Sequence, residues 1–186
     1  MTLRVGINGF GRIGRNVLRA IIESKRKDIE VVAINNRSSL KVCAHLLKYD
    51  SVHGTFPFEI STSENNLHVG DKKIFVSNET TIDGIRWDKS NVDLVMECTG
   101  KFNNAEECQK HINAGASKVL ISAPAKDADL TVVYGVNDEK INSGHNIISN
   151  ASCTTNCLAP IAKVLNDNFG IEEGFMTTVH SYTADQ

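Results

Sequence analysis

A cysteine placed where a strand turns into a helix is the residue in this sequence best suited to covalent chemistry. Cys153 follows the apolar run 146–148 and precedes a helical pattern of apolar residues. At a helix N-terminus, free backbone N–H groups and the helix dipole favour the thiolate, which is the nucleophilic form of the side chain. The same N–H groups can stabilise an oxyanion formed from a carbonyl. A buried structural cysteine is the alternative, and only the rest of the sequence decides between the two.

A glycine-rich turn near the N-terminus is the second candidate site. The apolar segment 3–7 leads directly into Gly9, Gly11 and Gly14, in the pattern G-x-G-x-x-G, and a helical pattern follows. A strand, a glycine turn and a helix in this order are typical of a dinucleotide-binding fold, where the turn and the helix N-terminus hold a pyrophosphate. A plain tight turn is the alternative. The next apolar segment, 30–35, favours the dinucleotide site because it fits the second strand of such a fold.

Two residues at the end of that second strand bear on the choice of cofactor. Asn36 stands where such folds place a carboxylate that holds the adenosine ribose, and Arg37 follows it. An amide can still hydrogen-bond a ribose hydroxyl, but it does not repel a 2′-phosphate, and Arg37 could pair with one. We expect NAD, because losing a repulsive carboxylate does not by itself build a phosphate site. Use of both NAD and NADP is the alternative.

Three segments resemble glyceraldehyde-3-phosphate dehydrogenases. The run N-G-F-G-R-I-G-R at 8–15 resembles the cofactor segment of that family, S-C-T-T-N-C at 152–157 its active-site segment, and V-H-S-Y-T at 179–183 the segment with its catalytic histidine. The resemblance extends from residue 4 to residue 186. It implies an α/β fold: a Rossmann-type, doubly wound and mainly parallel sheet with an antiparallel insertion in residues 1–150, and the incomplete start of an α+β catalytic domain in residues 151–186.

The resemblance also implies the roles of individual residues. Cys153 would be the nucleophile and His180 its base. The substrate and phosphate would bind at Ser152, Cys153, Thr154 and Thr183, although each of these hydroxyls could equally serve as a helix cap. The cofactor would be bound by the glycine turn and by the ends of later strands, at Asn8, Gly9, Phe10, Gly11, Arg12, Ile13, Gly14, Asn36, Arg37, Thr99, Gly100 and Ser122.

The implied reaction is the oxidative phosphorylation of glyceraldehyde 3-phosphate to 1,3-bisphosphoglycerate, a step of glycolysis and gluconeogenesis. It would proceed through a cysteine thioester, with hydride transfer to NAD and attack by inorganic phosphate. The alternatives are an erythrose-4-phosphate dehydrogenase, a Cys-His thiol hydrolase, against which the glycine turn argues, and a nucleotide-binding module without catalysis. Because the sequence stops soon after His180, we assign the activity to the parent enzyme and expect negligible turnover from the 186-residue chain alone.

Composition argues against several other classes of function. The chain has 20 Lys and Arg against 22 Asp and Glu, mixed along its length, so it offers no basic surface for nucleic acid or for an anionic membrane. No apolar run approaches the length of a membrane span, and no leader pattern precedes the first strand. The five cysteines have the spacing of neither a disulfide framework nor a metal site. We therefore expect a cytoplasmic enzyme, which the resemblance implies to be a homotetramer.

Several further elements must position these residues. Apolar runs predict strands at 93–98, 118–121, 130–134 and 146–149, and a helix that Asn104 caps. Short alternating segments over 56–76 predict an antiparallel unit with a hairpin turn at Gly70. Another alternating run, 175–181, predicts a last strand that carries His180.

Overall fold

A nine-stranded sheet organises the computed structural model, which describes residues 2–180. Strand β1 (Leu3–Asn8) lies inside the sheet, paired in parallel with β2 (Ile29–Asn35) on one side and with β8 (Leu94–Glu97) on the other. The strand order is β10-β11-β9-β8-β1-β2-β7-β6-β5. The other strands of this sheet are β5 (Ile60–Ser63), β6 (Asn66–Val69), β7 (Lys72–Ser77), β9 (Lys118–Ile121), β10 (Leu130–Thr131) and β11 (Ile147–Ser149).

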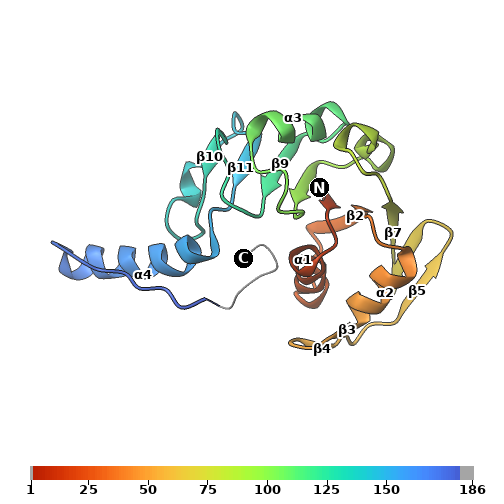
Figure 1. Cartoon of the computed structure of the whole chain (residues 1–186), viewed down its shortest axis with the longest axis horizontal. Coiled ribbons are helices and arrows are strands. Elements are labelled where there is room, and N and C mark those ends of the chain that lie inside the picture. Colours follow the sequence, from red (N-terminus) through yellow and green to blue (C-terminus); the bar gives the residue numbers. More distant parts are fainter. Residues whose placement is uncertain (1, 181–186) are drawn as a thin grey trace.

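Helices cover both faces of this sheet (Figure 1). Helix α1 (Arg12–Glu23) and α2 (Leu40–Lys48) pack on one face, and α3 (Ala105–Asn113) packs on the other through the fully buried Cys108. Short 3₁₀ turns, η1 (Ile82–Gly84), η2 (Trp87–Ser90) and η3 (Asp138–Lys140), connect the strands. Two-sided cover explains why the central strands are apolar on both faces. The predicted doubly wound, mainly parallel sheet is confirmed.

Side-chain caps begin α2, α3 and α4 (Cys153–Phe169). Ser39 Oγ accepts from the N–H of Val42 at the start of α2, and Asn104 Oδ1 accepts from the N–H of Glu107 at the start of α3. Ser152 caps α4 in the same way. Each cap satisfies a backbone donor that has no acceptor within its own helix. The predicted cap at Asn104 is confirmed.

The segment 56–76 forms an antiparallel unit, as predicted, but its last strand also joins the parallel sheet. Strands β5, β6 and β7 pair antiparallel, with Gly70 in the turn at a φ of +56°. Strand β7 also pairs in parallel with β2. A separate small hairpin, β3 (Tyr49–Asp50) with β4 (Gly54–Thr55), precedes the unit.

Two predicted strands differ from the structure. The run 130–134 forms only the two-residue strand β10, and residues 171–180 form no strand. A strand needs a neighbour to receive its backbone hydrogen bonds, and alternation in the sequence cannot supply one. Residues 171–180 are exposed and lie beside α4, with no described strand edge to pair with (Figure 1).

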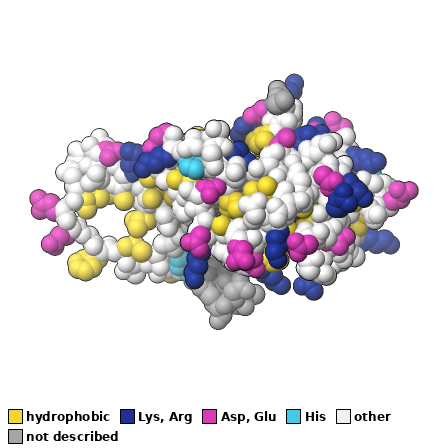
Figure 2. All heavy atoms as spheres, turned by 90° about the horizontal axis from the view of Figure 1, so that it is seen from above, with side chains coloured by type: hydrophobic (Ala, Val, Ile, Leu, Met, Phe, Trp, Pro, Cys, Tyr) yellow, Lys and Arg dark blue, Asp and Glu magenta, His cyan; other side chains and the backbone are white. Residues whose placement is uncertain are grey.

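Helix α4 extends away from the sheet and carries an exposed apolar stripe. None of its residues is buried, and apolar side chains gather over this end of the molecule in Figure 2. The stripe consists of Leu158, Ile161, Val164, Leu165 and Phe169. Across the described residues, no helix has both the length and the apolar character that crossing a bilayer requires.

A buried arginine joins α1 to the far end of α2. Arg19 is only 4% exposed and donates to the carbonyls of Leu47, Lys48 and Gly54 at 2.7–3.1 Å. Its guanidinium also lies over the ring of Phe56, 4.9 Å from the centroid. The bonds to Leu47 and Lys48 satisfy carbonyls at the C-terminus of α2 that no helical N–H can reach, and the bond to Gly54 ties β4 to the same guanidinium.

We predict that Arg19→Met lowers the free energy of unfolding by about 3 kcal/mol, because it leaves the buried carbonyl of Leu47 without its donors and removes the bonds to Lys48 and Gly54. Urea denaturation of the two proteins measures the change. Arg26→Met is the matched control, since Arg26 is exposed and, within residues 2–180, bonds only to Asp28, and it should leave the urea midpoint unchanged. Equal midpoints for Arg19→Met and the unchanged chain would contradict the prediction.

Candidate functional site

A cleft of about 250 Å³ opens at the carboxyl edge of the parallel strands. It lies where the chain order reverses, with β2 on one side of β1 and β8 on the other, which is where open α/β sheets bind their ligands. Loops after β1, β2, β7 and β8 provide its walls. The lining residues are Asn8, Gly9, Gly11, Asn35, Asn36, Arg37, Glu79, Thr80, Thr81, Ile82, Ile85, Cys98, Thr99, Lys101 and Phe102.

The glycine turn has the shape that a bound pyrophosphate requires. Gly9 has a φ of +93°, and a Cβ there would lie 2.8 Å from Thr99. A Cβ on Gly14 would lie 2.2 Å from the carbonyl oxygen of Gly9, so α1 packs directly on the turn. A Cβ on Gly11 would meet no atom within 4 Å, so this residue presents bare backbone to open space. Together with the free N–H groups that begin α1, this surface fits the diphosphate of a dinucleotide.

Asn36 braces the glycine turn from the side. Its Oδ1 accepts from the N–H of Phe10 at 3.1 Å, and its Nδ2 donates to Cys43 Sγ at 3.2 Å. Asn36 and Arg37 both line the cleft, so the end of β2 presents an amide and a guanidinium where many such folds present a carboxylate.

The other predicted cofactor residues surround the cleft without lining it. Arg12 forms an ion pair with Asp50, whose pKa is held well below its usual range by the N–H groups of His53 and Val52 and then by Arg12. Ile13 is half exposed on α1. Phe10, Gly14, Gly100 and Ser122 are likewise absent from the lining, and Ser122 follows β9, next to the end of β8.

Cys153 is the first residue of α4, as the sequence predicts. Ser152 Oγ accepts from the N–H of Thr155 at 3.0 Å, and Ala151 before it has a φ of +57°. Cys153 is exposed, and Thr154 Oγ1 lies 3.1 Å from His180 Nε2. The structure therefore brings the predicted cysteine and histidine segments together at this helix start. Thr183 lies outside the described residues.

The cleft and Cys153 lie along one edge of the sheet. The carboxyl ends of β2, β1, β8, β9 and β11 follow one another in that order, and α4 begins just after β11. Neighbouring strands lie about 4.8 Å apart, and β11 is three strands away from β1. The end of β11, which leads to Cys153, is therefore roughly 15 Å from the glycine turn that follows β1. No α4 residue lines the cleft, so the structure places the two sites along a common edge and not in a single cavity.

Two family models match the chain in comparison with known proteins. A family model described as "Glyceraldehyde 3-phosphate dehydrogenase, NAD binding domain" matches residues 3–105, more than half of the chain. The chain belongs to the glyceraldehyde 3-phosphate dehydrogenase family. The model of the family's C-terminal domain matches residues 152–186.

Named relatives in this family are similar over the whole chain. It is 56% identical over 186 residues to a glyceraldehyde-3-phosphate dehydrogenase of Xanthobacter flavus and 57% identical over 187 residues to that of Geobacillus stearothermophilus. A third, glyceraldehyde-3-phosphate dehydrogenase 1 of Bacillus subtilis, is 55% identical. All of the chain is covered in each case, and it spans 55–56% of the length of these relatives.

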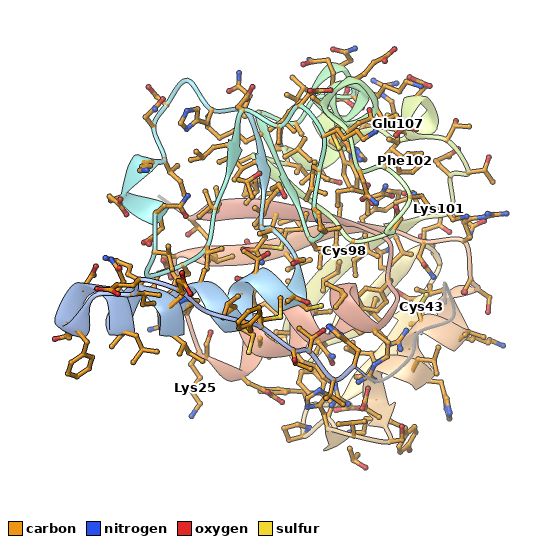
Figure 3. All side chains as sticks on the ribbon, turned by 60° about the vertical axis from the view of Figure 1, so that its left-hand side comes forward. Lys25, Cys43, Cys98, Lys101, Phe102 and Glu107 are labelled. Carbon is orange, nitrogen blue, oxygen red and sulfur yellow. The ribbon has the colours of Figure 1, made fainter. Side chains whose placement is uncertain are left out.

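Several cleft residues that follow β8 were not predicted from the sequence. Cys98, Lys101 and Phe102, labelled in Figure 3, line the cleft, and Glu97 before them is buried at the end of β8. One signal was available: Glu97 is a charged residue within the otherwise apolar run 94–98. Across residues 2–180, no group of three His, Cys, Asp or Glu side chains is arranged to hold a metal ion.

The five thiols differ in exposure and in pKa. Burial raises the pKa of Cys98 to about 11 and that of Cys108 to about 12, and it also raises the pKa of Cys43. Cys153 and Cys157 are exposed. Since the thiolate is the reactive form, a raised pKa lowers the reactivity of a thiol at every pH below it.

We predict that dithionitrobenzoate reacts rapidly with Cys153 and Cys157 at mildly alkaline pH and slowly with the other three thiols. The rate at Cys98 should be slow at mildly alkaline pH and should keep rising up to a pH of about 11, because its thiolate is a minor form below that value. Mass spectrometry of the modified peptides assigns each rate. Cys153→Ser should remove one rapid equivalent, and rapid labelling of Cys98 in the folded protein would contradict the assignment.

Proposed function

We propose that this chain forms the cofactor domain and the start of the catalytic domain of an enzyme that oxidises glyceraldehyde 3-phosphate to 1,3-bisphosphoglycerate, using NAD and inorganic phosphate. In this proposal residues 1–150 bind the cofactor and residues 151–186 begin the catalytic domain. The main support is that Cys153 at the start of α4 and His180 beside Thr154 stand on the same sheet edge as the glycine turn. Membership of the family and the named relatives add to it.

The order of strand ends indicates how the cofactor would lie. The end of β2, with Asn36, would take the adenosine, and Gly9, Gly11 and the start of α1 would hold the pyrophosphate. Thr99 and Ser122, after β8 and β9, would then face the nicotinamide side, nearest to α4. NAD, when bound, supplies a hydride acceptor.

Cys153 would carry the substrate through the reaction. Its thiolate adds to the aldehyde carbon, and N–H groups at the start of α4 stabilise the oxyanion that forms. His180, protonated when it holds Cys153 as the thiolate, gives its proton to this oxyanion. It takes the proton back from the resulting hydroxyl while the hydride leaves the same carbon, which becomes a thioester. Phosphate then attacks the thioester carbonyl, the Cys153 thiolate leaves, and an acyl phosphate forms. The hydroxyls of Ser152, Thr154 and Thr183 would hold the phosphate groups.

An erythrose-4-phosphate dehydrogenase would use the same residues, so only turnover separates the two reactions. A chimera of residues 1–186 followed by the remaining sequence of the Geobacillus stearothermophilus relative supports a direct test. It should form NADH from glyceraldehyde 3-phosphate, phosphate and NAD, and faster than from erythrose 4-phosphate. Cys153→Ser should abolish NADH formation in the folded chimera. Activity that survives this substitution would overturn the proposed mechanism. The homotetramer and the cytoplasmic location stay predictions.

We predict that Gly11→Ala weakens NAD binding about tenfold or more without unfolding the chain, because its methyl group would fill the space meant for the pyrophosphate. The φ of −76° at Gly11 is open to alanine, and a Cβ there meets nothing within 4 Å. Isothermal titration calorimetry and thermal melting measure the two properties. Gly14→Ala is the contrasting variant: it should lower the melting temperature even without NAD, since its Cβ would meet the Gly9 carbonyl at 2.2 Å.

We also predict that Asn36→Asp raises the preference for NAD over NADP about tenfold or more. The substituted carboxylate would keep an acceptor for the N–H of Phe10, and its charge would repel a 2′-phosphate. Calorimetric affinities for both nucleotides measure the ratio before and after the change. An equal effect on both affinities would show that the end of β2 does not face the 2′ position.

A further inference from the structure

A buried carboxylate beneath the cleft receives hydrogen bonds from two of the cleft's walls. Glu97, the last residue of β8, is 1% exposed. Its Oε2 accepts from Asn8 Nδ2 at 2.6 Å and from His111 Nε2 at 3.0 Å. Its Oε1 accepts from the N–H of Thr99 at 2.8 Å and from the Thr99 hydroxyl. Four donors therefore converge on one side chain.

The neighbouring bonds fix the direction of each of these contacts. Trp87 Nε1, which can only donate, lies 3.0 Å from His111 Nδ1, so the imidazole proton is on Nε2, facing Glu97. Thr99 Oγ1 accepts from the N–H of Lys101 at 3.1 Å, so its own proton is available to Glu97. Asn8 Oδ1 accepts from Asn35 Nδ2 at 2.9 Å, which turns its Nδ2 toward the carboxylate. All four groups that face Glu97 are therefore donors, and each needs an acceptor there.

The chain of bonds links three walls of the cleft, while Glu97 at its centre lies outside the lining. Asn8, the last residue of β1, and Thr99, in the turn after β8, line the cleft, whereas Glu97 and His111 do not line it. Asn35 continues the chain to the loop after β7, where its Oδ1 accepts from the N–H of Glu79 at 2.8 Å. Glu97 is therefore bonded to the walls of the cleft but does not itself line it.

We propose that Glu97, supported from behind by His111, is a positioning residue that holds the cleft in its cofactor-binding shape before the cofactor arrives. This inference rests on the proposed binding of NAD. Loops that are already ordered lose less conformational freedom on binding, so the same contacts give a higher affinity. The carboxylate suits this role because both of its oxygens are acceptors and each holds a different wall.

Glu97→Gln is the direct test because no orientation of glutamine satisfies the site. Either oxygen position faces donors only, so the new NH₂ group must point at donors already in place. We expect the affinity of the chain for NAD, measured by calorimetry, to fall tenfold or more. In NAD-free protein, the amide NMR signals of Gly9, Thr99 and Lys101 should broaden, and saturating NAD should sharpen them again.

Substitutions of His111 test the positioning role from outside the cleft, because His111 bonds to Glu97 and does not line the cleft. They also keep the proposal testable if the Glu97 variant does not fold. His111→Leu removes one donor to Glu97 from outside the cleft and should weaken NAD binding severalfold, while His111→Gln, which keeps a donor, should weaken it less. The double variant with Glu97→Gln should bind no more weakly than Glu97→Gln alone, because His111 acts through Glu97. Leu67→Ala, in the fully buried core on β6, is the control: it should lower the melting temperature and leave NAD affinity unchanged.

Two results would overturn the proposal. If Glu97 mattered only as a negative charge beneath an anion site, Glu97→Gln would bind NAD as tightly as the unchanged chain or more tightly. Sharp, unshifted amide signals for the cleft loops in both the Glu97 and the His111 variants would show that the walls do not depend on these residues. Failure of the unchanged chain to bind NAD would instead reject the proposed cofactor site, and the NAD-free spectra would still decide the positioning role.

Discussion

The arrangement of the cleft depends on placing a carboxylate in the interior without a cation beside it. Burying such a group costs several kcal/mol unless hydrogen bonds replace its water. At Glu97 that replacement comes from Asn8, Thr99 and His111, which belong to three different elements. The loops around the glycine turn are therefore held together by the need to satisfy one buried side chain, in addition to the packing of the apolar core.

The parallel sheet sets the spacing of the functional segments beyond the cleft. Because β2, β1, β8, β9 and β11 all end at the same edge, the features that follow them stand in a row at a spacing set by strand pairing. An extended ligand laid from the end of β2 across the glycine turn would reach the start of α4 at its other end. Under the proposed function, Cys153 after β11 would in this way meet the far end of a dinucleotide although the cleft itself contains no α4 residue.

Local features of the sequence predicted the glycine turn, the cap at Asn104 and the helix start at Cys153, because each depends on residues close together in the chain. The strand predicted over 175–181 was wrong within the described residues, since alternation says nothing about whether a partner strand exists. The bonds of Glu97 could not be predicted for a similar reason. Asn8 lies 89 positions away, and only the register of β1 against β8 brings the two side chains together.

Trp87 is the only tryptophan of the chain, and it is 1% exposed at the outer end of the bonds that lead through His111 to Glu97. Indole emission is sensitive to the polarity around the ring and to the partner of its N–H group. The protein therefore carries an intrinsic fluorophore whose N–H group bonds to His111, which in turn bonds to Glu97 beneath the nucleotide cleft. The emission of Trp87 can therefore report a change in the hydrogen bonds of His111 and Glu97 without an added label.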